Sequence, residues 1–490
     1  MAGLGGAGGG TGKKPVAGLE LSGLEVENVK FRVITDIAIH HAPMQHGRAV
    51  VTGRMEMEDA QKLFTQNKLE KVFKITGTGG EDNKEKQLLF QGCMTDMQML
   101  APDKNKTEQT VILRFADTSI LMDLERKSQT FQDTGKKYDD IFKAACKDAK
   151  ITINKGDKAI GNFTLRLEET DWEFVQRMAS RLGQPVCSDL TAEKPLVILG
   201  KPESANTYQY SSSLSSMSVA AESFARQEAA DKQGESKAKK AVREDYVAAV
   251  LEIPSYHYLG DTFMVQKKKY AVAALDLFVR GGQLMTRYSL MPEGSFFMPG
   301  DIRLALAGRM MKAQVKKVEK DKVQLHFIEI DKSYDTASKV WFPFATVYSS
   351  NDGSGWYVMP EVEDYVRVTF PSGDEAEAFA SSSLNTAPLE KPRDKSFKAP
   401  GGKEILLTEE GVEIICDHQK IFVALDKKKG ISIVSSQGIN VVADGNISLN
   451  AKGKVQIVAK EEIQLQSGSS HVKIKKNQIA MGGSQVLVGE

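Results

Sequence analysis

The sequence has little that would direct the protein to nucleic acid or into a membrane. Its 490 residues include 65 Lys and Arg against 64 Asp and Glu, and this balance gives no whole-chain attraction to an anionic partner. No apolar run approaches the ~20 residues that cross a bilayer, and the first residues lack the apolar segment of a secretory signal. We therefore expect a soluble protein that binds no nucleic acid and is not exported by the usual signal.

Cysteine is scarce as well. The four cysteines are far apart in the chain, at Cys93, Cys146, Cys187 and Cys416. None forms a CxxC pair, and the seven histidines are scattered, so neither a disulfide framework nor a zinc site is indicated. We expect buried thiols in a protein made in the cytosol, with no metal and no cofactor.

Residues 1–18 are rich in glycine and are expected to form a flexible tail. A phosphate-binding loop would need Gly where Ala7 stands and Ser or Thr where Lys14 stands, between a strand and a helix. These conditions are not met, so the tail is not expected to bind a nucleotide.

What the sequence does have is an eight-residue repeat near its end. Between Gly430 and Ser469 the second and fourth residues of each block are apolar, and turn-forming residues separate the pairs. Because successive side chains on a strand point to opposite sides, each pair lies on one face of a short strand. The predicted core residues are Val423, Leu425, Ile431, Ile433, Ile439, Val441, Ile447, Leu449, Val455, Ile457, Ile463 and Leu465.

One copy of such a ribbon cannot enclose its own core. Two apolar side chains in every eight residues offset too little of the entropy lost on ordering the chain, and the unpaired edges would template aggregation. Identical chains wound about one axis would supply both the core and the hydrogen-bond partners, and three is the smallest number that closes a prism. We predict a triple-stranded β-helix needle at 393–490, formed in a homotrimer. A hairpin array in an ordinary sandwich is the alternative.

The region from about 19 to 335 is expected to be a mainly β hub with some α structure. Its segments alternate apolar and polar residues like half-exposed strands. Amphipathic helices are predicted over 55–66 and 137–150, and a third begins at the capping box of Thr170 and Glu173. Trp172 lies on the apolar side of that third helix and is predicted to be core. A charged connection is expected at about 221–245.

Residues 336–392 are expected to form a small closed barrel of the oligonucleotide-binding (OB) type. About five short strands are separated by turns at 351–355 and 371–374. Nucleic-acid binding would need exposed aromatics in a basic groove, whereas Arg367 is nearly alone among acids. The predicted barrel is therefore structural.

Three segments together resemble the valine-glycine repeat protein G (VgrG) family of spike proteins. "MPEVEDYVRVTFPSGDEAEAFASSSL" at 359–384 is similar to the small barrel of the spike, and "EETDWEFVQRMASRLGQPV" at 168–186 to a helix of its hub, which is related to the baseplate hub of contractile phages. "PGGKEILLTEEGVEI" at 400–414, followed by the octads, resembles the start of the needle. The order of hub, barrel and needle covers almost the whole chain from Leu19.

The chain departs from the family pattern at a few places. Glu363 stands where the barrel usually has Gly, and 382–403 is too short to hold the lysozyme domain that phage spikes insert there. His471 is alone, whereas needle tips that hold iron use paired histidines. We expect a short form with no metal, no lysozyme domain and no effector domain.

The resemblance implies a mechanical function and no enzyme activity. The homotrimer would cap an inner tube, contact baseplate proteins and carry effectors or a small tip protein of the PAAR-like kind at its "GGSQVLVGE" end. Such a particle is assembled in the bacterial cytoplasm and is delivered outside or into a target cell on firing, with transient contact to the target membrane. A type VI secretion system, an extracellular particle and a phage-like bacteriocin are all compatible with the sequence.

Two other classes of function stay open. A β-helical glycan-degrading enzyme would need convergent carboxylates, but the acids of the needle are scattered through different phases of the repeat; they are Asp417, Asp426, Asp444, Glu461 and Glu462. A trimeric tail-fibre-like adhesin would not need the hub-like first two-thirds. Release of sugar fragments from peptidoglycan would identify the enzyme, and electron microscopy of particles would separate a central spike from a peripheral fibre.

Overall fold

In a computed structural model the chain divides into two compact units, Met1–Leu384 and Asn385–Glu490. The structure describes residues 15–487, apart from gaps at 81–83, 101–106, 155–156, 205, 211–215, 220–223, 226–227, 229–241, 266, 293–301, 385–389 and 418–419. The expected charged connection at 221–245 and the near-match to a phosphate loop therefore lie largely outside the described residues. Each unit is described below by itself.

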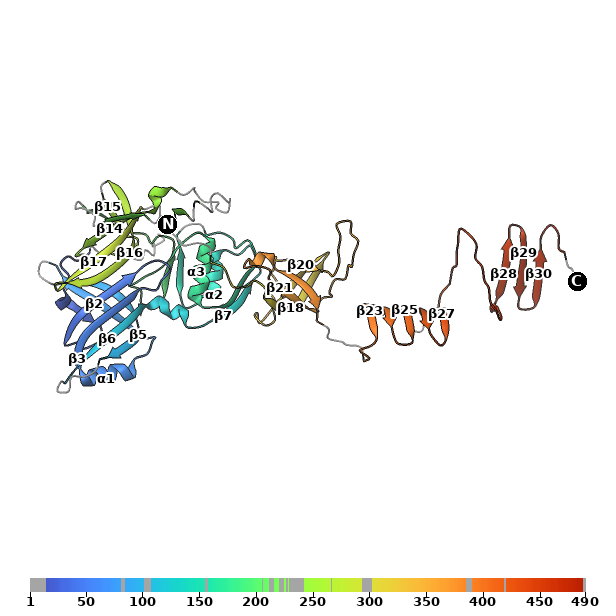
Figure 1. The fold of residues 1–490 in the computed structure, drawn as a ribbon, viewed down its shortest axis with the longest axis horizontal. Coiled ribbons are helices and arrows are strands. Elements are labelled where there is room, and N and C mark those ends of the chain that lie inside the picture. The colour runs from blue at the N-terminus through green and yellow to red at the C-terminus, as the bar shows by residue number, and fades with distance from the viewer. Residues whose placement is uncertain are drawn as a thin grey trace, which may run out of the picture. The chain divides into compact units, whose positions relative to one another are not determined.

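A twelve-stranded sheet forms the larger part of the first unit (Figure 1). Its two halves meet where β2 pairs with β16, over Ile39 and Leu277 and their neighbours. One apolar core fills the region, as the half-exposed strands of the sequence predict. Along the sheet the order is β1 (Leu24–Val26), β4 (Val72–Gly79), β5 (Glu85–Met99), β6 (Glu108–Asp117), β3 (Arg48–Glu56), β2 (Val33–His41), β16 (Lys268–Arg280), β17 (Gln283–Pro292), β14 (Val247–Ile253) and β13 (Ser216–Val219), with β12 (Thr207–Tyr210) and β15 (Thr262–Val265) attached through β16.

A second core surrounds the two helices α2 (Tyr138–Ala145) and α3 (Asp171–Arg181). The predicted capping box is confirmed: the Glu173 amide donates to the Thr170 hydroxyl at 3.1 Å and the Thr170 amide to the Glu173 carboxylate at 3.0 Å. Trp172 is buried, also as predicted. The strands of this region are β7 (Lys127–Phe131) paired with β9 (Thr164–Glu169), and a sheet of β10 (Val186–Ser188), β11 (Leu196–Leu199) and β8 (Lys150–Ile153).

Two of the expected helices are shorter than the sequence suggested. Helix α1 spans Met57–Gln66, and α2 ends at Ala145 although helix was expected through 150. Lys150 instead begins β8, which pairs in parallel with β11. A long-range strand pairing therefore takes Lys150, which local periodicity assigned to the end of a helix.

The closed barrel consists of β18 (Met310–Glu319), β19 (Lys322–His326), β20 (Phe342–Ala345), β21 (Tyr365–Thr369) and β22 (Phe379–Ser383). It begins at 310 rather than at the expected 336. The reason is that β18 pairs with both β19 and β21, so the barrel cannot close without it. A compact apolar core fills its interior.

Of the flexible tail expected for 1–18, residues 1–14 lie outside the described residues, and the described end of the tail is held in place from Val16. Val16 is buried, and its amide donates to the side chain of Gln87 at 2.9 Å. Ala17 bridges Ser255 and accepts from the amide of Gly80. The sheet edge therefore holds the chain from Val16 onward.

The cysteines are buried as predicted at three positions and exposed at the fourth. Burial raises the pKa of Cys93 to about 11 and that of Cys146 to about 12, and it also raises the pKa of Cys187. These three thiols are inert at neutral pH. The prediction was wrong for Cys416, which is exposed because it lies in the second unit, where no second layer covers the strands.

The second unit contains two small antiparallel sheets. Five strands follow one another in chain order: β23 (Lys395–Ala399), β24 (Lys403–Leu407), β25 (Gly411–Asp417), β26 (Ile421–Asp426) and β27 (Gly430–Ser435). Three more form the second sheet: β28 (Glu462–Ser467), β29 (Ser470–Lys475) and β30 (Gln478–Gly482). Among the described residues of this unit only Glu404 and Ile415 are buried.

Glu363, the departure from the family pattern, has a left-handed backbone with φ of 76°. An L-residue with a side chain is strained in that region, whereas glycine is not. The Glu363 carboxylate partly offsets this strain, because it lies 2.8 Å from the Lys316 ammonium and accepts from the Gln314 side chain at 2.9 Å. These contacts are exposed and contribute little free energy.

Replacement of Glu363 by Gly is therefore expected to stabilise the barrel by about 0.5–1 kcal/mol, because relief of the strain exceeds the loss of the exposed contacts. Amides of β18 and β21 that exchange through opening of the barrel should exchange about two- to fivefold more slowly. Glu361→Gly is the control, since Glu361 lies in the same turn and has no positive φ. An equal effect of the two variants would contradict the strain argument.

Candidate functional site

The candidate site of the second unit is an apolar face that nothing covers. Strand register places Val423 opposite Ile433 and Leu425 opposite Ile431, so these four predicted core residues share one face of a sheet. Ile463 and Leu465 likewise share a face with Ile474 and Val472 of β29. We call the twelve predicted core residues, from Val423 to Leu465, the apolar stripe.

Ten of the twelve residues of the stripe are exposed in the single chain. Ile431 is 72% exposed and Leu449 is 74% exposed, and the two that are not exposed, Val423 and Ile463, are only half-buried. Monomeric proteins rarely leave an apolar surface of this extent in water. The stripe therefore needs a cover that this chain does not supply.

The same face extends further toward the N-terminus than the repeat predicted. Val423 also pairs with Ile414 of β25, and Ile414 pairs with Ile405 of β24, which in turn faces Phe397 of β23. Phe397, Ile405 and Ile414 are all exposed. The sequence analysis missed these residues because β23 to β25 do not repeat at eight residues, although "EILL" and "VEI" carry the same alternation.

The opposite face of β25–β27 is hollowed and mixed in character. The hollow has a volume of about 520 Å³, and its lining combines charged, polar and apolar side chains. These include Glu413, Phe422, Asp426, Lys429 and Val434. Carboxylates and lysines on this side suit contact with water, whereas Val423, Leu425, Ile431 and Ile433 lie on the other side.

The middle of the repeat has no sheet partner in the single chain. No strand is present between Ser435 and Glu462, which are the end of β27 and the start of β28, and six predicted core residues fall in this part. They are Ile439, Val441, Ile447, Leu449, Val455 and Ile457. The structure therefore brings together the outer members of the stripe in sheets. The six residues of the middle lie outside any strand and are exposed. Backbone N–H and C=O groups of the segment likewise lack strand partners.

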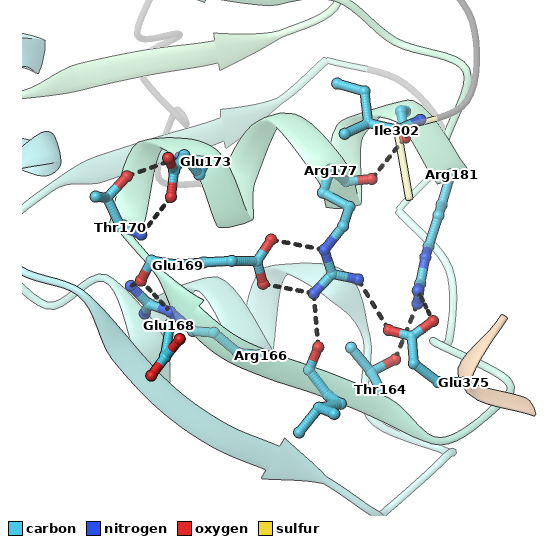
Figure 2. Close-up of polar contacts among 12 residues, drawn as sticks. Thr164, Arg166, Glu168, Glu169, Thr170, Glu173, Arg177, Arg181, Ile302 and Glu375 are labelled. Carbon is cyan, nitrogen blue, oxygen red and sulfur yellow. Dashed lines mark hydrogen bonds and ion pairs between the residues drawn. The ribbon is translucent and has the colours of Figure 1, made fainter. Parts of the chain in front are cut away.

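A cluster of buried ion pairs connects the hub to the barrel inside the first unit. Arg177 of α3 is fully buried and joins the Glu169 carboxylate, in two contacts of 2.7 Å, to Glu375, at 2.9 Å (Figure 2). Arg181 reaches the other oxygen of Glu375. Glu375 belongs to the short helix η4 (Glu375–Glu377) between β21 and β22 of the barrel. We call Glu169, Arg177, Arg181 and Glu375 the junction cluster.

Further polar contacts surround the junction cluster. Ser180 of α3 accepts from the amide of Ile302 at 3.1 Å, and Arg166 contacts the Asp171 carboxylate at 2.7 Å (Figure 2 labels Ile302 and Arg166). Elsewhere on the hub–barrel boundary, Thr130 donates its amide to Asp331 at 2.9 Å. Burial raises the pKa of Asp331, and the hydrogen bonds from Thr130 oppose that rise.

The chemistry of the junction cluster is structural. Each carboxylate of the cluster is paired with a buried arginine, which is the arrangement of a structural ion-pair network. Within the described ranges there is no group of three or more His, Cys, Asp and Glu side chains that could hold a metal ion. No described helix is both long enough and apolar enough to cross a membrane.

Comparison with known proteins bears first on the barrel. Residues 311–384 match the family model of the type VI secretion system/phage-baseplate injector OB domain. No curated protein matches the chain. The match covers β18 to β22, so the part of the chain that forms the closed barrel is also the part that the family model describes.

Solved structures extend the likeness beyond the barrel. A chain of the half-lidded Francisella PdpA–VgrG complex superposes with a TM-score of 0.52 at 9% identity, over 86% of this chain and 88% of that one. The lidded form gives 0.52 at 8%, over 82% and 76%. The E. coli c3393 protein, a type VI secretion component described as similar to the T4 tail proteins gp27 and gp5, gives 0.49 at 11%, over 74% and 99%. The resemblance predicted from the sequence is confirmed: this chain is VgrG-like in its fold, and its barrel matches the family model of the type VI secretion and phage-baseplate injector OB domain.

Proposed function

We propose that three copies of this chain form the central hub-spike of a contractile injection system. The observation that carries this proposal is the stretch between β27 and β28, where apolar side chains and backbone groups both lack partners in one chain. Two further copies, wound about the same axis, supply both kinds of partner. The apolar stripe then lines the interior of a needle, and the polar residues between its members face water.

The proposed spike acts mechanically and not as an enzyme. Its hub caps the inner tube and contacts baseplate proteins, and contraction of the sheath drives the needle through the target envelope. A closed prism suits this task because it leaves no free strand edge. The match of 311–384 to an injector OB domain supports a place in such a particle.

The remaining partners and the localisation follow from the same proposal. The particle is assembled in the bacterial cytoplasm and is released or delivered into a target cell on firing, with brief contact to the target membrane. Val486 and Leu487 are exposed near the end of the chain and offer an apolar seat for a PAAR-like tip protein or an effector. The PdpA–VgrG complex is a case of a partner protein held by a related fold.

The junction cluster gives the proposed spike a rigid connection between hub and barrel. Thrust on the hub reaches the barrel through the boundary at which Arg177 binds both Glu169 and Glu375. Ion pairs of this kind are directional, and both partners are desolvated, so the boundary resists sliding more than an apolar contact would.

Leu449→Asp is expected to abolish the trimer, because three carboxylates would meet in the interior of the needle without counter-ions. Ser448→Asp is the matched control, since residue 448 lies in the same octad on the opposite, water-facing side. Sedimentation equilibrium of the full chain measures both. We expect the wild-type chain and Ser448→Asp to sediment as trimers, with Leu449→Asp as single subunits or aggregates. A monomeric wild type, or equal behaviour of the two variants, would overturn the proposal.

Glu375→Gln is expected to destabilise the barrel and its boundary by about 3 kcal/mol, because it leaves two buried or half-buried arginines without their shared counter-charge. Glu377→Gln, on the same short helix but exposed, should change stability by less than about 0.5 kcal/mol. Differential scanning calorimetry of the full chain compares the two. Equal transition temperatures of the two variants would show that the Glu375 ion pairs do not stabilise the barrel and its boundary.

A further inference from the structure

The barrel carries an exposed aromatic hairpin that the mechanical function described so far does not use. It spans 346–358, between β20 and β21. Five large apolar side chains of this hairpin are exposed, among them Val347 at 92% and Tyr357 at 75%. The five are Val347, Tyr348, Trp356, Tyr357 and Val358.

Hydrogen bonds of the backbone and of polar side chains hold this hairpin in shape. The amide of Trp356 donates to the carbonyl of Tyr348 at 2.8 Å, and the Thr346 hydroxyl donates to the Trp356 carbonyl at 2.6 Å. At the tip the Asp352 carboxylate accepts from both the amide and the hydroxyl of Ser354. The Tyr357 hydroxyl ties the base to the carbonyl of Lys320 at 2.8 Å.

Gly355 shows that the close approach of the two arms is built into the sequence. Its φ is 139°, and a Cβ at this position would lie 2.4 Å from the carbonyl oxygen of Tyr348. Only glycine fits there. The arms are thus fixed before any partner arrives, and a surface that is already ordered loses less entropy on binding.

Composition points to a protein partner. Tyr and Trp are the residues that most often dominate protein–protein contacts, and each can bury about 150–250 Å². Asp352 is the only charged residue of the hairpin. Without Lys or Arg it offers none of the electrostatic attraction that nucleic acid or an anionic membrane requires.

We infer that this hairpin docks on the barrel of a second copy of this chain and clamps the three barrels together. The inference rests on the proposed trimer: only residues 384–394 separate β22 from β23, so assembly of the needle strands brings the three barrels to a high effective concentration. The barrel also offers apolar side chains to receive the hairpin, because Met310, Val318 and Val362 are exposed on it.

Photocrosslinking of the full chain tests this docking. A benzophenone amino acid is placed at Val347, which is exposed and outside the core of the barrel, and in a matched variant at Phe64 of α1, which is 58% exposed. Irradiation is expected to give a covalent two-chain product from Val347 in at least tenfold higher yield than from Phe64. Vesicles of phosphatidylethanolamine and phosphatidylglycerol are included in a parallel sample.

The outcomes separate this inference from the proposed function. Equal two-chain yields from the two positions, or products with lipid alone, would overturn the docking even if the chain sediments as a trimer. A wild-type chain that sediments as a single subunit would instead overturn the trimer itself.

A second measurement uses subunit exchange between differently tagged trimers. The double variant Trp356→Ser, Tyr357→Ser should exchange subunits about tenfold faster than wild type, whereas Phe64→Ser should exchange at the wild-type rate. Neither Trp356 nor Tyr357 belongs to the barrel core, so the variant is expected to keep its fold, and the calorimetric transition of the barrel checks this. An unchanged exchange rate in a folded double variant would contradict the clamp.

Discussion

A β-strand satisfies its backbone groups only beside another strand and hides its apolar side chains only beneath another layer. In the second unit the stretch between β27 and β28 meets neither requirement, and the two small sheets meet only the first. The hub meets both: its sheet encloses a continuous apolar core, and the barrel closes on itself so that no edge remains. In the last hundred residues, by contrast, just two described side chains are buried. The contrast between the two units is the physical reason to look for other copies of the chain.

The same requirement links the features of the first unit to those of the second. In the proposed spike, a needle that derives its core from three chains must be joined to its base through a part that is rigid in each chain by itself. The closed barrel is such a part, and the junction cluster fixes it to α3 of the hub through charges that water does not screen. The proposed docking of the aromatic hairpin on a second copy would add a contact between chains at the barrel.

Local signals in the sequence were enough to predict several elements. The capping box at Thr170 and Glu173 needs only four residues, and it begins α3 as predicted. The alternation of Val423, Leu425, Ile431 and Ile433 placed these side chains on one face, and the strand register agrees. Such features depend on period and turn chemistry, which the sequence displays directly.

Features that depend on distant pairing were missed. Arg177 and Glu375 are 198 residues apart, and nothing in either neighbourhood signals the other. The barrel was predicted to start at 336 and not at 310, because the pairing of β18 (Met310–Glu319) with β21 joins strands that are far apart in the sequence. Cys416 was expected to be buried, since burial is usual for cysteine, but the strand that carries it has no cover in one chain.

The most direct measurement of the central idea is amide hydrogen exchange by mass spectrometry across 438–461, on full-length protein as purified. In an assembled needle these amides bond to neighbouring chains, and we expect them to stay unexchanged for hours. Exchange within seconds over this stretch, in a sample whose hub amides are protected, would show that the octads have no partners and would contradict the account.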